Sequence, residues 1–309
     1  MKPYVLIMGV HGFIGSALKR WLLTNVRNVE IFGLDIRPFK SPDKNFFLSD
    51  LKNQKQIIHV LSKIRPRFIF HLAGGRMEEP EKLLEANVYS TQNLLAAIAE
   101  MKDYHPRVII PGSAAEYGQP HQRQKLIREN DPPKPTSHYG LTKLMQTSLA
   151  LMYARRGLDV VVGRIFNICG AGTTEAFALG KFAKDIALIE SGKKEKRVTT
   201  RSLAGQRDFL DIRDVCSALW AVAGKGKKGE VYNICSQKSS SVRTLLKKMI
   251  SLSRERGIVI DEQKASSSGS FDAVGSNTKI KKNTGWRPKV RLKESLKDTL
   301  NYYRRCEFS

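Results

Sequence analysis

The chain has 309 residues, 41% of them hydrophobic, which is enough to bury a sizeable core in one or two lobes. Lys and Arg outnumber Asp and Glu by 53 to 29, which gives a formal net charge of +24 at pH 7. No apolar run reaches the length of about eighteen residues expected of a transmembrane helix. The four cysteines form no C-x-x-C pair, so we expect reduced thiols in a cytoplasmic protein, and neither a disulfide framework nor a metal site.

The positive charge has two interpretations. A basic surface can mark a nucleic-acid-binding protein. Here, however, the basic residues are spread along the chain, and the small clusters at 193–196, 225–228 and 279–282 contain no stacking aromatic side chains. We therefore interpret the charge as a solvated surface and expect no nucleic-acid partner.

The first predicted unit is a strand at 4–8, a glycine-rich turn at 9–15 and a helix at 16–23. The turn has the spacing G-x-x-G-x-x-G, with glycines at Gly9, Gly12 and Gly15. Glycines permit a tight turn and a close approach of the backbone to a pyrophosphate, and the helix N terminus supplies N–H groups and a positive dipole end. This unit predicts a dinucleotide-binding turn.

A second predicted strand at 29–34 leads to Asp35, twenty residues after Gly15. A carboxylate in this position accepts hydrogen bonds from the adenosine ribose hydroxyls and repels a 2′-phosphate. The sequence therefore favours NAD(H), and NADP(H) stays open because Arg37 would weaken this preference.

The residues predicted to be catalytic lie in the middle of the chain. Strands are predicted at 68–72, 108–111 and 160–165, and helices at 80–101 and 139–156. Ser113 follows one of these strands, and Tyr139 and Lys143 lie four residues apart, on one face of a helix. A nearby ammonium lowers the pKa of a tyrosine, and a serine can hydrogen-bond the same substrate oxygen. These three residues predict catalysis of a redox step at a carbonyl or an alcohol.

The remaining elements are predicted as helices near 177–191 and 242–256, a strand at 231–234 and a Ser/Gly-rich loop at 265–270. Strands that alternate with helices predict an α/β fold, with a doubly wound, Rossmann-type parallel sheet. We predict a dinucleotide-binding domain at 1–166 plus 212–240. A smaller C-terminal α/β substrate lobe is predicted at 167–211 plus 241–309.

Together, the glycine turn, Ser113, Tyr139 and Lys143 resemble the extended short-chain dehydrogenase/reductases, also called the NAD-dependent epimerase/dehydratase family. Matching segments run through the whole chain, at 71–75, 87–95, 164–170, 207–215, 229–234 and 285–288. The resemblance implies a homodimer that acts on a nucleotide-diphosphate sugar.

The resemblance also implies a set of binding residues. Ser113, Tyr139 and Lys143 would be catalytic. The implied cofactor contacts are Gly9, Gly12, Phe13, Ile14, Gly15, Asp35, Arg37, Asp50, Leu51, Leu72, Ala73, Gly74, Asn87 and Lys143. The implied substrate contacts are Arg76, Ser113, Glu116, Asn167, Arg207 and Arg287. Arg207 would bind the diphosphate or, alternatively, pair with Asp208 or Asp211, and His71 is expected to pack beneath the cofactor loop.

The segment after Ser113 narrows the choice of reaction. A 4,6-dehydratase needs additional acid/base groups, and the resemblance implies an acidic residue two places before Tyr117 in such enzymes. This chain has Ala115 there, which cannot transfer a proton. Glu116 stands one residue after this position, and in a strand-like segment its side chain would point to the opposite face of the strand. Reduction and C4 epimerisation both remain. The 116–118 ending resembles that of GDP-4-keto-6-deoxy-mannose reductases, which favours reduction. A C4 epimerase is the alternative, and a non-catalytic NAD-binding regulator with nucleic-acid affinity is a remote one.

Overall fold

The computed structural model describes residues 2–38, 43–75, 77, 79–119, 126–200, 203–263 and 273–308. Arg76 and the predicted loop at 265–270 lie outside the described residues. Within the described part, no helix is long and apolar enough to cross a membrane.

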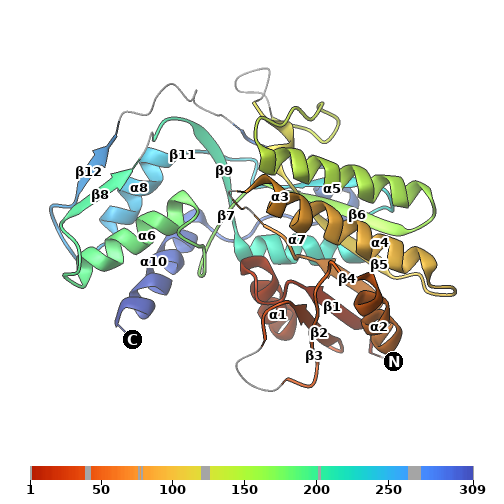
Figure 1. The fold of residues 1–309 in the computed structure, drawn as a ribbon. Helices are drawn as coiled ribbons and strands as arrows, with labels where there is room; N and C mark the ends of the chain where they lie inside the picture. The colour runs from red at the N-terminus through yellow and green to blue at the C-terminus, as the bar shows by residue number, and fades with distance from the viewer. Residues whose placement is uncertain are drawn as a thin grey trace.

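The centre of the molecule is a seven-stranded sheet in the order β10-β6-β5-β4-β1-β2-β3, in which all pairs are parallel (Figure 1). Its strands are β1 (Tyr4–Met8), β2 (Glu30–Asp35), β3 (Phe46–Leu48), β4 (Phe68–His71), β5 (Arg107–Ser113), β6 (Asp159–Ile165) and β10 (Val231–Ile234). Parallel neighbours need crossover connections, and helices supply them. The predicted doubly wound sheet is confirmed.

Helices cover both faces of this sheet. They are α1 (Phe13–Asn25), α2 (Gln54–Ile64), α4 (Ser90–Glu100), α5 (His138–Arg155) and α7 (Ile212–Lys225). Successive side chains of a strand point to opposite faces. Val5 and Ile7 therefore pack with α1 and α7, whereas Leu6 and Met8 pack with α2, α4 and α5. Burial on both faces explains why these strands are almost continuously apolar in the sequence.

The predicted helix at 80–101 consists of three parts: α3 (Pro80–Leu83), a π-helical segment η1 (Leu84–Tyr89) and α4. The π-helical segment carries Asn87, whose side chain is fully buried. Such wide turns are frequent at functional sites. The apolar periodicity predicts the helix but does not distinguish the π-helical turn.

After Ser113 the chain forms a 3-10 helix, η2 (Ala114–Tyr117), and not the strand-like segment expected from the sequence. The cause is a reciprocal cap: the Ser113 hydroxyl accepts a hydrogen bond from the Ala115 N–H (3.2 Å), and Glu116 Oε1 accepts one from the Ser113 N–H (2.7 Å). This is the S-x-x-E capping box, which the sequence itself contains.

The remaining elements form a second group, which lies to one side of the large sheet in Figure 1. It has two small sheets, in the orders β11-β9-β7 and β12-β8, and a core of its own under α6, α8 and α10. The bounds are β7 (Asn167–Cys169), β8 (Arg197–Thr200), β9 (Gln206–Asp211), β11 (Ser239–Ser241), β12 (Val259–Glu262), α6 (Ala178–Glu190), α8 (Val242–Ser251) and α10 (Leu292–Phe308). Helix α9 (Thr278–Thr284) packs instead against α7 and β10 of the large sheet. The chain returns to the large sheet at β10, and the two domain ranges stay a proposal.

Candidate active site

The glycine turn follows β1 and packs tightly against the start of α1. Gly9 has a φ of +79°, which favours glycine, and a Cβ on it would lie 2.6 Å from the Ala73 nitrogen. A Cβ on Gly15 would lie 2.1 Å from the Gly9 carbonyl oxygen. The N-cap of α1 is Gly12, which makes no side-chain hydrogen bond. The first turn of the helix therefore presents backbone N–H groups without a capping side chain, as an anion-binding turn requires.

The carboxylate of Asp35, at the end of β2, is tied to the glycine turn. It accepts hydrogen bonds from the backbone N–H groups of His11 (3.0 Å) and Arg37 (3.1 Å). The Arg37 guanidinium also contacts it at 3.3 Å, and 63% of the Arg37 side chain remains exposed. Two carboxylate oxygens have about four lone-pair sites, so Asp35 retains acceptor capacity for a ribose.

A third part of the site follows β4. Leu72 is buried, and Gly74 has a φ of +109°. The Asn87 side chain accepts from the Gly75 N–H and donates to the Gly75 carbonyl, both at 3.1 Å, and it donates to the Thr142 hydroxyl at 3.2 Å. Asn87 thus fastens the loop after β4 to helix α5.

Asp50 and Leu51 lie in the turn before α2, with Leu51 buried and Asp50 half-buried. The Asp50 carboxylate accepts a hydrogen bond from the Lys52 N–H at 2.9 Å. Phe13 and Ile14, in the first turn of α1, are both half-buried. Leu51 packs in one core cluster with Met8 of β1 and Leu34 of β2.

The sheet order explains why these segments meet. The chain runs outward in one direction from β1 to β3, and in the other from β4 to β6, so the order reverses between β1 and β4. In open parallel sheets, ligands bind outside the carboxyl ends of the strands at such a reversal. Gly9, Asp35, Leu72 and Ser113 all stand at carboxyl ends of strands in this sheet.

The predicted catalytic residues come from two packed segments. Ser113 ends β5 and is 9% exposed, and Tyr139 lies half-buried in the first turn of α5. Gly140 lies so close to η2 that a Cβ on it would be 2.4 Å from the Ala115 carbonyl oxygen. The start of α5 therefore sits directly against the turn that follows Ser113.

Lys143 is buried on the same helix, one turn after Tyr139. Its ammonium donates a hydrogen bond to Gln146 Oε1. Burial lowers the pKa of Lys143 to about 8, and the carboxylate of Glu116 opposes this change. The lysine therefore remains largely charged at pH 7. The sequence analysis did not identify Gln146, although its spacing of i+3 from Lys143 indicates a shared helix face.

Glu116 lies behind Ser113. It is 0% exposed, and its second carboxylate oxygen accepts a hydrogen bond from Arg164 Nε on β6 at 2.7 Å. The Arg164 guanidinium also stacks over the Tyr117 ring, 4.7 Å from its centroid. Burial raises the pKa of Glu116, and Arg164 opposes this change. The structure thus places Glu116 in a buried ion pair that supports Ser113.

Two further predicted substrate contacts, Asn167 and Arg207, lie on the second group of elements. Asn167 is half-buried on β7, and its amide donates to the Asp208 carbonyl at 3.0 Å. Arg207 is half-buried on β9. The Asp208 carboxylate accepts from the Ser236 N–H at 2.7 Å and from the Ser236 hydroxyl at 2.6 Å. These contacts fix the position of β9.

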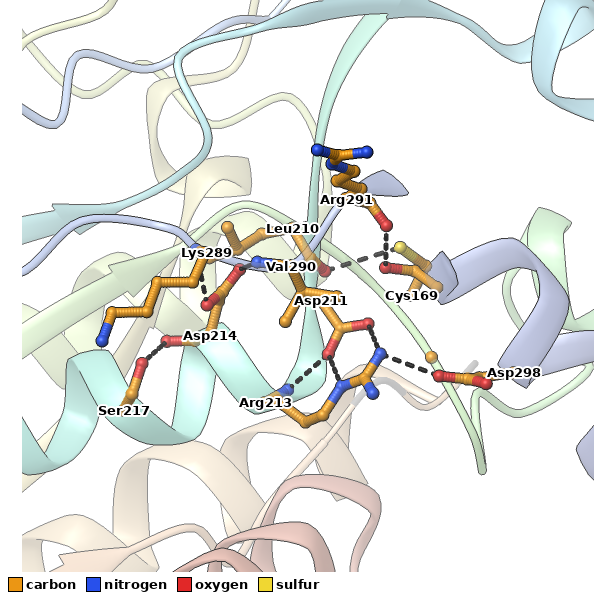
Figure 2. Close-up of polar contacts among 12 residues, drawn as sticks. Cys169, Leu210, Asp211, Arg213, Asp214, Ser217, Lys289, Val290, Arg291 and Asp298 are labelled. Atoms are coloured by element: carbon orange, nitrogen blue, oxygen red, sulfur yellow. Dashed lines mark hydrogen bonds and ion pairs between the residues drawn. The ribbon is translucent and has the colours of Figure 1, made fainter. Parts of the chain in front are cut away.

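Figure 2 shows how Asp214 is joined to Lys289 and Val290, which directly follow the segment 285–288. The Asp214 carboxylate at the start of α7 accepts from the N–H groups of Lys289 and Val290, both at 2.9 Å. Nearby, the Arg213 guanidinium pairs with Asp211 and, at 2.8 Å, with Asp298 of α10. Arg287 is exposed on the joined segment.

No group of three or more His, Cys, Asp or Glu side chains in the described part of the chain is arranged to hold a metal ion.

Comparisons with known proteins agree with this geometry. A family model described as "NAD dependent epimerase/dehydratase family" matches residues 5–235. The GDP-6-deoxy-D-mannose reductase of Pseudomonas aeruginosa is 30% identical, over 97% of this chain and 97% of that protein. The GDP-6-deoxy-D-talose 4-dehydrogenase of Aggregatibacter actinomycetemcomitans is 30% identical, over 81% of this chain and 80% of that protein. The solved structure of RMD from Pseudomonas aeruginosa complexed with NADPH superposes with a TM-score of 0.86 at 26% identity, covering 98% of this chain and 99% of that one.

Proposed function

The chain belongs to the NAD dependent epimerase/dehydratase family, and from this premise we propose that it is an NAD(P)-dependent oxidoreductase acting at C4 of a nucleotide-diphosphate sugar. In the proposed reaction it reduces a 4-keto-6-deoxy sugar nucleotide of the GDP-4-keto-6-deoxy-mannose type. Relatives named as a GDP-6-deoxy-D-mannose reductase and a GDP-6-deoxy-D-talose 4-dehydrogenase support this substrate class. The observation that carries the proposal is the packing of the start of α5, which holds Tyr139, against the turn that follows Ser113, together with the burial of Lys143 one turn later on α5.

A dinucleotide fits the residues at the carboxyl edge of the sheet. The close approach at Gly9 and Gly15 leaves backbone N–H groups at the uncapped start of α1 for a pyrophosphate. Asp35 would accept hydrogen bonds from the adenosine ribose, which favours NAD(H), while the exposed Arg37 guanidinium leaves NADP(H) possible. When bound, the nicotinamide supplies or accepts the hydride at C4 of the sugar.

The protein's own residues move and hold the proton. Tyr139 gives a proton to the C4 oxygen in reduction, or takes it in oxidation, and the Ser113 hydroxyl holds the same oxygen. An ammonium has three N–H donors. One donor of Lys143 is engaged by Gln146, so two remain for the nicotinamide ribose and for stabilising the Tyr139 phenolate.

The surroundings of Ser113 support hydride transfer without loss of water. The position two before Tyr117 is Ala115, which has no proton to transfer. Glu116 does not supply the missing acid, because both of its oxygens are engaged by the Ser113 N–H and by Arg164 in the interior. We therefore propose that Glu116 positions Ser113 and does not contact the sugar.

One observation favours a second candidate, a C4 epimerase. An epimerase retains its cofactor through oxidation and re-reduction, and Asp35 favours the NAD that such an enzyme uses. The proposed reductase should consume one NADH per product, whereas an epimerase should interconvert C4 epimers without net change in nicotinamide absorbance.

A turnover screen separates these candidates. The purified protein is incubated with GDP-, UDP-, CDP- and dTDP-sugars, with and without a 4-keto group, and with NADH or NADPH. The products are identified by mass spectrometry. We expect stoichiometric NADH oxidation with a GDP-linked 4-keto-6-deoxy sugar. Release of a 4-keto-6-deoxy product from GDP-mannose would overturn the argument from Ala115.

We also propose a homodimer, as the family resemblance implies. Leu141 and Met145 on α5 and Tyr89 on η1 are large apolar side chains exposed in the single chain, and a second copy would cover such a surface. Light scattering of the purified protein tests this proposal, and a monomer at micromolar concentration would contradict it.

A further inference from the structure

Lys143 ends a chain of buried hydrogen bonds that runs between α5 and the π-helical turn. The ammonium donates to Gln146 Oε1, and Gln146 Nε2 donates to Thr91 Oγ1 at 2.7 Å. The Thr91 hydroxyl in turn donates to the Asn87 carbonyl at 2.8 Å. Lys143, Gln146, Thr91 and Asn87 are each at most 5% exposed. These hydrogen bonds therefore connect α5, which carries Tyr139 and Lys143, to Asn87, which holds the loop after β4.

The direction of every bond in this chain is fixed by chemistry. An ammonium only donates, so Gln146 must present its carbonyl to Lys143 and its amide to Thr91. The single hydroxyl hydrogen of Thr91 goes to the Asn87 carbonyl, so Thr91 Oγ1 must accept from its other neighbour, His71 Nε2, at 3.0 Å. His71 thus carries a hydrogen on Nε2. Burial lowers the pKa of His71 to about 3, which favours the neutral ring.

His71 Nε2 is consequently a hydrogen-bond donor, so it cannot accept a hydrogen bond from Lys143. It is fully buried on β4, and within the described residues its Nδ1 has no hydrogen-bond partner. A neutral His71 adds no positive charge beside Lys143. Among the described residues, the carboxylate of Glu116 on η2 acts on Lys143 and favours its charged form, and Tyr139 lies one turn earlier on the same helix.

From this arrangement we propose that Gln146 is a positioning residue, which holds the Lys143 ammonium in place for the proton transfer at Tyr139. The effect on catalysis rests on the proposed function. The effect of Gln146 on the charge of Lys143 does not. A buried ammonium needs hydrogen-bond acceptors to remain charged. Gln146 provides one from the same helix, while its amide is itself held by Thr91, so the acceptor cannot turn away without breaking a second bond.

Gln146→Met is the informative substitution, because methionine has a similar length and removes both hydrogen bonds. Without the acceptor, the charged form of Lys143 is disfavoured, so its titration midpoint should fall by roughly one pH unit. The midpoint is read from the εCH₂ carbon shifts of protein labelled with ¹³C-lysine, and the Lys143 signal is assigned by its loss in Lys143→Met. This titration needs no substrate. A negative result therefore counts against the role of Gln146, whereas a negative turnover screen counts against the proposed function.

Gln92→Met is the matched control. Gln92 also bridges α4 and α5, since its amide donates to the Tyr153 hydroxyl at 2.8 Å, but it does not contact Lys143. We expect an unchanged Lys143 midpoint and unchanged activity in Gln92→Met. In Gln146→Met, kcat should fall about tenfold or more while the KM for the sugar changes little, because Gln146 acts through Lys143.

An unchanged Lys143 midpoint in a folded Gln146→Met protein would overturn the proposal, as would equal shifts in the two glutamine variants. If Gln146→Met does not fold, as judged by circular dichroism, Gln146→Glu replaces it. A carboxylate keeps an acceptor beside the ammonium and adds an opposite charge, so the Lys143 midpoint should then rise. A midpoint that does not rise in Gln146→Glu also overturns the proposal.

Discussion

The buried pair of Glu116 and Arg164 should be sensitive to the loss of one charge. Glu116→Gln keeps the shape of the side chain and an oxygen for the Ser113 N–H, but it removes the negative charge. The Arg164 side chain is only 5% exposed, so its guanidinium would be left in the interior without a counter-charge. Removing one partner of a buried ion pair costs about 3–5 kcal/mol of the free energy of unfolding.

This loss can be measured directly. For domains of about 150–250 residues, each kcal/mol corresponds to roughly 2–4 °C in Tm, so Tm should fall by ~6–20 °C. The matched control is Glu175→Gln. Glu175 pairs with Lys184 at 2.5 Å, but 60% of the glutamate side chain is exposed. Exposed pairs contribute about 0–1 kcal/mol, so the control should unfold almost as the unmodified protein does.

The same two variants distinguish a positioning role of Glu116 from substrate binding. If Glu116 instead contacted the sugar, Glu116→Gln would raise KM and leave the free energy of unfolding within about 1 kcal/mol of the unmodified value. Equal thermal and urea unfolding curves for Glu116→Gln and Glu175→Gln would refute the reasoning from burial.

Three further predictions concern single residues. Tyr139→Phe should reduce turnover by ~100-fold or more with little change in cofactor affinity, and near-normal activity would contradict the mechanism. Asp35→Ser should relax the preference for NADH over NADPH, measured as the ratio of kcat/KM values; a preference of the unmodified protein for NADPH would show that Arg37 dominates. His71 has a pKa of about 3 in the fold and 6.5 when unperturbed, so the unfolded state binds a proton that the folded state does not. The free energy of unfolding should therefore decrease from pH 6.5 toward pH 3, by up to ~1.4 kcal/mol per pH unit from this group. His71→Gln should lose this slope in urea unfolding at pH 7, 6 and 5, and an equal slope would mean that His71 is not buried in its neutral form.

The sequence predicts the parallel sheet well because its strands are buried on both faces. The apolar run at 4–8 is β1 (Tyr4–Met8), and the run at 231–234 returns to the same sheet as β10. The small sheets of the second group could not be predicted in this way. Strand β11 is the run Ser239–Ser241, which pairs with β9 through the backbone and has no apolar alternation. Its strand conformation depends on its tertiary neighbour.

The candidate site shows the same division between local and distant contacts. Tyr139 and Lys143 could be paired from their spacing, since i and i+4 share a helix face. Thr91 and Asn87 could not be connected to them, because these residues lie on α4 and η1, 55 positions before their hydrogen-bond partners Gln146 and Thr142 on α5. The π-helical turn that carries Asn87 has no signature in the apolar periodicity. Glu116 did have a local signal, the S-x-x-E capping box, which predicts a carboxylate turned back toward the Ser113 N–H.

The position of Glu116 connects the stability of the site to the reaction that it can support. Two cations, Arg164 and Lys143, lie in the interior near the candidate catalytic residues, and burial disfavours both charges. Within the described residues, the carboxylate of Glu116 favours both charges, through a direct ion pair with Arg164 and through its field at Lys143. A carboxylate with this role has to stay ionised and fixed, whereas the acid of a dehydratase has to release a proton to the substrate. The two roles are incompatible in one side chain, and position 115, where the resemblance would place a separate acid, is an alanine. In the proposed reaction, the same buried charges would keep Lys143 available for Tyr139 and would favour hydride transfer at C4 over the removal of water.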